Sequence, residues 1–230
     1  MSGWWTYRLS DFLLFSPRTY YRLFELYNAQ VWPAHVATLA LGLALLVALM
    51  RGGEPGRRAA YTLLGAAWLW IGWGFHIARY ATINWAAVFF GVAFVLEGAL
   101  LFTLAAVGGR APRGAARNLR RRLGVGLLAF AIAGHPLLGM LFGRPWAQAE
   151  VFGLAPDPTA LGTLGALLLS PVAAAPPLIR ALLLLLWSVP LLWALVSGAT
   201  LWAMQAPDAW LLPLSALLAL LVLLPARRRA

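Results

Sequence analysis

The chain has 230 residues, of which 62% are hydrophobic and only 11% are charged, and its formal net charge is +11. Soluble domains are about 45–50% apolar and about 25% charged, so this composition excludes an ordinary water-soluble domain. The chain has no cysteine and no lysine. It therefore has no disulfide, no thiolate metal site, no covalently attached haem and no Schiff base.

Residues 1–33 are predicted to form an interfacial arm. Its aromatic side chains are Trp4, Trp5, Tyr7, Phe12, Phe15, Tyr20, Tyr21, Phe24 and Tyr27. Charged residues are interleaved with them, and Pro17 is typical of the first position of a helix. An aromatic and basic segment of this kind favours lying along a membrane surface. The alternative is that the arm docks onto another subunit.

Residues 34–226 are predicted to form an all-α, polytopic transmembrane bundle. The apolar segments cover residues 34–50, 58–79, 85–107, 123–143, 158–174, 178–204 and 209–225. Most of them approach the roughly 20 residues that cross a bilayer, and each must be helical because lipid cannot satisfy an open sheet edge. Segment 158–174 is short, so a re-entrant helix with six full spans is the alternative to seven spans.

Clustered arginines predict the orientation of this bundle. They follow the first and third segments and recur in a basic tail at residues 227–230, whereas the loops on the other side hold only Arg79 and Arg144. Because positive loops stay in the cytoplasm, we expect a cytoplasmic C-terminus and a multi-pass protein of the bacterial inner membrane. The opposite helix ends carry the expected tryptophan belt, Trp32, Trp85, Trp146, Trp202 and Trp210.

Three ionisable residues fall deep inside the predicted spans: His76, Glu97 and His135. Burial of such groups in a membrane costs on the order of 2.5–3.5 kcal/mol, so each one is informative. At about 1.5 Å per residue, Glu97 and His135 lie at nearly the same depth. This predicts a polar intramembrane pair that clamps two helices, with a proton or ion relay as the functional alternative.

His76 and His135 are also the candidate cofactor ligands. Gly72 and Ala131 lie one turn before them, and a small residue there leaves room for a planar macrocycle such as haem or chlorophyll. Small residues are common in membrane helices for packing alone. The sequence therefore requires no cofactor, and no metal site is predicted.

A proline-rich loop precedes the short fifth segment, and its candidate site residues are Glu150, Pro156, Asp157, Pro158 and Thr159. Asp157 suits an N-cap and Pro158 the first helical position. A capped, closely packed helix is the structural interpretation. The functional alternative is a helix N-terminus that faces an anion or a polar solute.

The sequence contains no catalytic motif: there is no phosphate-binding glycine loop, no His-Glu-x-x-His and no nucleophile elbow. We therefore expect a non-enzymatic accessory or structural subunit whose partners are the lipid bilayer and other membrane subunits, with no nucleic acid. A small-solute or ion carrier that uses His76, Glu97, His135 and the Asp157 loop is one alternative. A haem- or pigment-binding membrane protein is the other.

Three stretches together suggest a family: residues 27–34 (YNAQVWPA), residues 83–91 (INWAAVFFG) and residues 152–159 (FGLAPDPT). The chain resembles an uncharacterised bacterial family of small polytopic membrane proteins, a domain of unknown function. The resemblance covers most of the chain after the arm. It implies an inner-membrane protein without an assigned activity, and it supplies no catalytic residue.

Overall fold

The computed structural model describes residues 13–107, 118–170 and 175–223. Its α-helices are α1 (Pro17–Val31), α2 (Ala34–Arg51), α3 (Glu54–Trp70), α4 (Ala87–Val107), α5 (Asn118–Ala129), α6 (His135–Leu141), α7 (Pro156–Leu168), α8 (Pro177–Leu185), α9 (Ser188–Ala203) and α10 (Leu211–Leu223). The π-helices η3 (Ile71–Ile77) and η6 (Phe130–Gly134) and the 3-10 helices η4 (Tyr80–Thr82) and η7 (Trp146–Gln148) join them. The described ranges contain no strand, which confirms the all-helical class.

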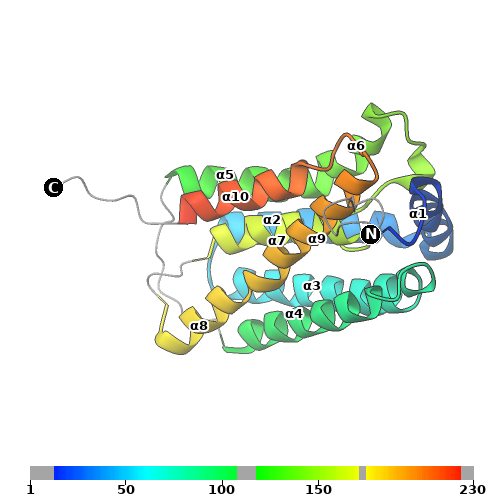
Figure 1. Ribbon diagram of the computed structural model, residues 1–230. Helices are drawn as coiled ribbons and strands as arrows, with labels where there is room; N and C mark the ends of the chain where they lie inside the picture. The colour runs from blue at the N-terminus through cyan, green and yellow to red at the C-terminus, as the bar shows by residue number, and fades with distance from the viewer. Residues whose placement is uncertain (1–12, 108–117, 171–174, 224–230) are drawn as a thin grey trace, which may run out of the picture.

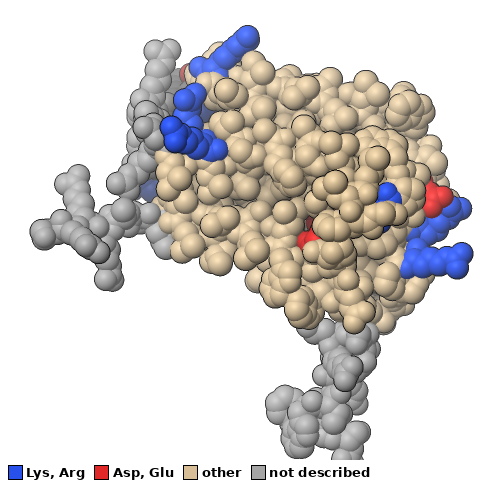
Figure 2. All heavy atoms as spheres, turned by 90° about the horizontal axis from the view of Figure 1, so that it is seen from above, with Lys and Arg blue, Asp and Glu red and all other residues tan. Residues whose placement is uncertain are grey.

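The longer helices run alongside one another, and α1 lies across one end of the bundle (Figure 1). Helix α2 ends, and α3, α5 and α8 begin, at the end of the bundle opposite to α1. The segments therefore run up and down alternately. Seen from above, the described arginines gather towards the two ends, with a broad band of other residues between them (Figure 2).

Helix α1 begins at Pro17, as predicted, and the side chain of Ser16 accepts a hydrogen bond from the Thr19 amide to cap it. Its buried aromatic face packs on the bundle: the ring of Phe24 lies 4.9 Å from that of Phe75 in η3. Within the described residues, this part of the arm docks on its own chain. Residues 1–12 lie outside the described part of the chain.

In the part of the chain that the structure describes, four helical segments are long and apolar enough to cross a membrane: Ala34–Arg51, Ala87–Val107, Leu119–Leu141 and Pro177–Ala203. Helix α10 is apolar but shorter, with 13 residues. Helix α7 also has 13 residues, which makes it about 20 Å long, less than the roughly 30 Å of a bilayer core. Seven full spans are therefore not shown by helix length.

Glycines set which helices lie together. A Cβ on Gly98 in α4 would lie 2.9 Å from the backbone oxygen of Gly65 in α3, and a Cβ on Gly72 in η3 would lie 2.8 Å from that of Gly91. These backbones can approach closely only because no side chain intervenes. Gly124 in α5 faces Gly165 in α7 in the same way. Helix α4 thus packs on α3, while α5 packs on α7.

Candidate functional site

The buried polar residues gather around α7, whose 13 residues are all buried. Asp157 lies in its first turn, where Oδ1 accepts a hydrogen bond from Nε1 of Trp193 at 2.8 Å and Oδ2 accepts one from Oγ of Ser197 at 2.6 Å. The predicted N-cap role of Asp157 is wrong, because the helix begins at Pro156 and Ala155 is the N-cap. Proline favours the first helical position, which leaves the carboxylate free to bind α9.

Two threonines anchor the same helix. Oγ1 of Thr159 accepts a hydrogen bond from the Gly153 amide at 2.8 Å, and Oγ1 of Thr163 accepts one from Nε1 of Trp68 at 2.8 Å. At the other end of α7, Nη2 of Arg120 donates to the carbonyl oxygen of Ser170 at 2.8 Å. Two of the predicted loop residues, Asp157 and Thr159, therefore anchor α7 in the middle of the bundle through their side-chain hydrogen bonds.

Next to α7 lies an ion cluster that the sequence did not predict. Arg144 pairs with Glu150 at 3.2 Å and with Asp208 at 2.7 Å, and its guanidinium lies 4.5 Å from the centre of the Tyr21 ring. The cluster joins α1, the loop before α7 and the loop before α10. The sequence places Arg144 in an outer loop, but only folding shows that Asp208, 64 positions later, reaches it.

Burial and charge oppose each other in this cluster. Burial raises the pKa of the Glu150 carboxyl above its usual range, although the neighbouring Arg144 guanidinium lowers it. Burial lowers the pKa of Arg144, but the carboxyls of Glu150 and Asp208 and the Tyr21 phenol raise it, and the net shift is upward. Burial raises the pKa of Tyr21 to about 12.

Glu97 and His135 do not form the predicted pair. Glu97 is fully buried on α4, and neither of its carboxyl oxygens has a hydrogen-bond partner. His135 begins α6, which lies on the other side of the bundle from α4 (Figure 1). It interacts electrostatically with Asp157 and with the backbone of Glu150 instead. The two residues match in depth, but depth does not fix which helices are neighbours.

His76 is sealed within aromatic rings. The ring centroid of Phe94 lies 4.4 Å from that of His76, and the ring centroid of Trp193 lies 4.9 Å from it. The rings of Phe75, Tyr80 and Phe90 are within 6.1 Å as well. The predicted space beside Gly72 is taken up by the backbone of α4. These rings occupy the volume that a macrocycle would need, so the arrangement does not fit haem ligation at His76.

The candidate site residues that the structure describes are not arranged as metal ligands. Within residues 13–107, 118–170 and 175–223, no three histidine, aspartate or glutamate side chains are arranged to hold a metal ion. Trp193 links the two buried groups, because its indole touches His76 and donates to Asp157. The indole of Trp193 in α9 therefore holds α7 and η3 together.

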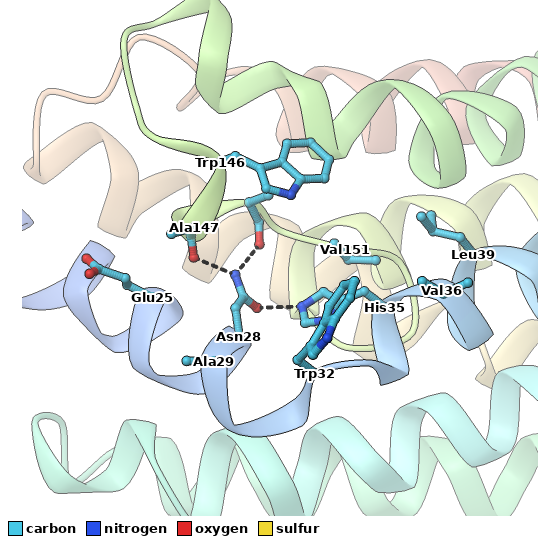
Figure 3. A pocket seen from close by; sticks show the side chains of 11 residues that line it. Glu25, Asn28, Ala29, Trp32, His35, Val36, Leu39, Trp146, Ala147 and Val151 are labelled. Atoms are coloured by element: carbon cyan, nitrogen blue, oxygen red, sulfur yellow. Dashed lines mark hydrogen bonds between the residues drawn. The ribbon is translucent and has the colours of Figure 1, made fainter.

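A cavity of about 570 Å³ lies at the end of the bundle where α1 meets α2 and η7. Its lining residues are Glu25, Asn28, Ala29, Trp32, His35, Val36, Leu39, Trp146, Ala147, Ala149 and Val151. Figure 3 shows Asn28 between Glu25 on one side and the indoles of Trp32 and Trp146 on the other. Val36 and Leu39 lie farther along α2, and Val151 lies in the loop before α7. We call the cavity the interfacial pocket, because it lies at the junction of α1, α2 and η7 and two tryptophans, Trp32 and Trp146, line it.

The side chain of Asn28 joins three parts of the wall of the interfacial pocket by hydrogen bonds. Its Nδ2 donates to the carbonyl oxygens of Ala147 at 2.9 Å and Ala149 at 2.8 Å, so its Oδ1 must face Nε2 of His35, 3.2 Å away. The Nε2 atom of His35 therefore carries the proton. The sequence offered one signal for this pocket: Asn28, Trp32 and His35 recur at near-helical spacing.

A second cavity, of about 330 Å³, runs between α2 and α3. We call it the α2–α3 groove. Small or apolar residues line it: Ala34, Thr38, Leu41, Gly42, Leu45, Leu63, Ala66, Ala67, Trp70, Phe152, Gly153 and Leu154. On α2 the lining residues extend from Ala34 to Leu45, about 16 Å along the axis. The groove is thus as long as three turns of a helix.

A family model described as a family of unknown function, DUF6064, matches residues 18–230. The match includes α1, so it starts earlier than the predicted resemblance, and it confirms an uncharacterised family. No curated protein and no solved structure matches the chain.

Proposed function

The chain belongs to the DUF6064 family of unknown function, and we propose that it is a non-enzymatic accessory subunit of a larger complex in the bacterial inner membrane. One observation supports this above all. Only 11% of Ala34–Arg51 is buried inside the chain, whereas the other three candidate spans are each 39% buried. Helix α2 therefore lacks cover that its own chain gives to the other spans.

We propose that a transmembrane helix of a partner subunit supplies this cover at the α2–α3 groove. Small residues at a membrane-helix interface let two backbones approach closely, and packing then drives the association. Ala66 and Ala67 present such a surface on α3, and the exposed side chain of Leu41 extends it on α2. An apolar helix fits this groove, because its lining carries no charged side chain.

The proposed topology has seven alternating segments, an outer N-terminus and a cytoplasmic C-terminus. The alternation of the helices in Figure 1 supports it. So does the distribution of arginine, because Arg51, Arg58 and Arg120 to Arg122 lie at the end of the bundle opposite to α1. In this proposal α7 counts as a segment shielded from lipid by the other helices.

The carrier hypothesis has less support. Neither the interfacial pocket nor the α2–α3 groove is lined by His76, Glu97, His135 or Asp157. The carboxylate of Asp157 is already bound on both oxygens. A packing role explains these contacts without a transported solute.

Native mass spectrometry of the full chain, purified from its own membranes in mild detergent, tests the proposal. We expect a defined second subunit at fixed stoichiometry. Ala66→Trp, which fills the groove, should reduce the bound subunit by roughly tenfold, the effect of about 1.4 kcal/mol. Ala99→Trp on the exposed face of α4 is the matched control and should leave it bound. A lone chain with a bound solute, or equal behaviour of the two variants, would contradict the proposal.

A further inference from the structure

We infer that the interfacial pocket binds an amphiphile with an ammonium head and an alkyl body. The inference does not depend on a partner subunit in the α2–α3 groove, because the two cavities use different residues of α2. It extends the proposed function by assigning a ligand class to a site that a structural subunit does not need.

The size and layering of the pocket suit such a molecule. Its volume of about 570 Å³ lies within the range of about 300–1,000 Å³ that is usual for small-molecule sites. The polar side chains Glu25, Asn28 and His35 line the end nearest α1, whereas Leu39 lies one turn deeper than His35 along α2. The head of an amphiphile would thus lie at the membrane boundary, with its chain beside α2.

The charge of the pocket selects a cation. The chain has 18 arginines against 7 acidic residues, yet the residues that line this pocket include one acid, Glu25, and no arginine. The indoles of Trp32 and Trp146 flank the same space (Figure 3). Aromatic faces attract ammonium groups, by about 0.5–1 kcal/mol at exposed sites. The pocket thus offers an ammonium head two indole faces, and its one carboxylate, that of Glu25, lies at the other end of the pocket, beyond Asn28 (Figure 3).

Hydrogen bonding points the same way. Nδ2 of Asn28 gives both of its hydrogens to carbonyl oxygens, and Nε2 of His35 gives its hydrogen to Asn28. These donors are used within the wall, so neither is available to an anionic head. Glu25 pairs with Arg22 and accepts a long hydrogen bond from Gln148 at 3.5 Å. A carboxylate has about four acceptor sites, so capacity remains for an ammonium donor.

Two sources supply this chemistry: a phospholipid with an ethanolamine head and a free alkylamine. The full chain is reconstituted in nanodiscs with equal amounts of phosphatidylethanolamine and phosphatidylglycerol, and the retained lipid is counted by native mass spectrometry. We expect preferential retention of the ethanolamine lipid if the source is a phospholipid. Dodecylamine added to the sample should displace it, whereas dodecyl sulfate should not. Binding of dodecylamine without lipid preference would identify the free amphiphile as the source.

Two variants test the site itself. Glu25→Gln should weaken retention of the amine by roughly tenfold, the value of one charge-assisted contact, while Glu54→Gln is the control. Glu54 is also an acid in a local arginine pair, but it lies at the other end of the bundle. Ala29→Trp should abolish binding by filling the pocket while Glu25 stays, and Ala99→Trp should not. Circular dichroism checks that every variant is folded.

The inference is overturned by either of two results with folded protein. One is equal retention of the glycerol lipid and the ethanolamine lipid together with no binding of dodecylamine. The other is unchanged binding of the amine by both Glu25→Gln and Ala29→Trp.

Discussion

Helices α2 and α7 are built from similar residues, chiefly leucine, alanine, glycine and threonine, but they occupy opposite environments. All 13 residues of α7 are buried, whereas only Gly42 and Leu45 are buried among the 18 residues of α2. The difference lies in their polar contacts. Helix α7 is bonded to α9 through Asp157 and to α3 through Thr163, whereas the side-chain bonds of α2 are confined to its first two turns.

This contrast indicates which contacts determine the central helix in a strongly apolar chain. In lipid there is no hydrophobic drive to separate one leucine-rich helix from another, so packing and interhelical hydrogen bonds decide. Helix α7 has both, because Gly165 meets Gly124 and side-chain hydrogen bonds join Asp157 and Thr163 to neighbouring helices. Helix α2 has few such contacts, and so its surface remains available for a lipid or a partner.

The largest expected effect comes from closing the gap between α7 and α5. In Gly165→Ala, the new Cβ would lie 2.7 Å from the backbone oxygen of Gly124, so the helices must separate. We expect a loss of about 3 kcal/mol in unfolding free energy, the upper range for overpacking. Thermal unfolding followed by circular dichroism in detergent measures it. Gly126→Ala is the control, because nothing lies within 4 Å of its Cβ. Its unfolding free energy should rise by up to about 1 kcal/mol.

Asp157→Asn should be the next largest change. The amide keeps the shape of the side chain but offers one oxygen to two donors, so either Trp193 or Ser197 loses its acceptor. An unsatisfied buried donor costs about 2 kcal/mol. The same unfolding assay applies, with Ser215→Ala as control because Ser215 bonds within α10. Equal stability of the two variants would mean that Asp157 does not anchor α7.

Asn28→Ala tests one of the few side-chain contacts of α2, the hydrogen bond between His35 and Asn28 of α1. It removes the hydrogen bonds to Ala147 and Ala149, and His35 loses its partner. Because the site is part-buried and partly open to water, we expect the unfolding free energy to fall by about 1 kcal/mol. We also expect faster proteolysis at the junction of α1 and α2. A protease time course on the reconstituted protein checks this. Cleavage at the wild-type rate would show that Asn28 does not hold the arm.

The smallest expected effect is a pH dependence from the ion cluster. Because burial raises the pKa of Glu150 in the folded protein, its contribution to stability is fully present below its ordinary value of about 4.3. It is lost as the pH rises through the higher folded value. Glu150→Gln should flatten the stability profile over that window, because the amide does not titrate. A wild-type profile that rises with pH, unchanged by the substitution, would reverse the sign.

The sequence predicted the helical class, the start of α1 at Pro17 and most apolar segments, because these follow from local composition and proline position. It could not predict that α7 lies at the centre, since hydropathy along the chain is alike for buried helices and for helices exposed on the surface of the bundle. The partners of Asp157 lie 36 and 40 positions away on α9. No local rule connects them.

The Glu97–His135 pair failed for a related reason. The residue number gives the position of a residue along its helix. It does not say which helices are neighbours, because close contacts between helices, such as Gly65 with Gly98 and Gly72 with Gly91, determine that. In each of the two contacting segments the glycines are seven residues apart, a spacing visible in the sequence. This spacing is the signal that pairs α3 with α4, and it gives no reason to pair α4 with α6.

The most direct test of the uncovered face of α2 uses the absence of cysteine in the natural chain. Leu41→Cys on α2, in the α2–α3 groove, and Leu96→Cys on α4 replace side chains that are 47% and 59% exposed in the isolated chain. A lipid-soluble thiol reagent is applied to native membranes and to the purified chain in lipid. The account predicts that the thiol of Leu41→Cys is protected in native membranes and becomes reactive after purification, while the thiol of Leu96→Cys reacts equally in both. Equal reactivity of the two variants in native membranes would contradict it.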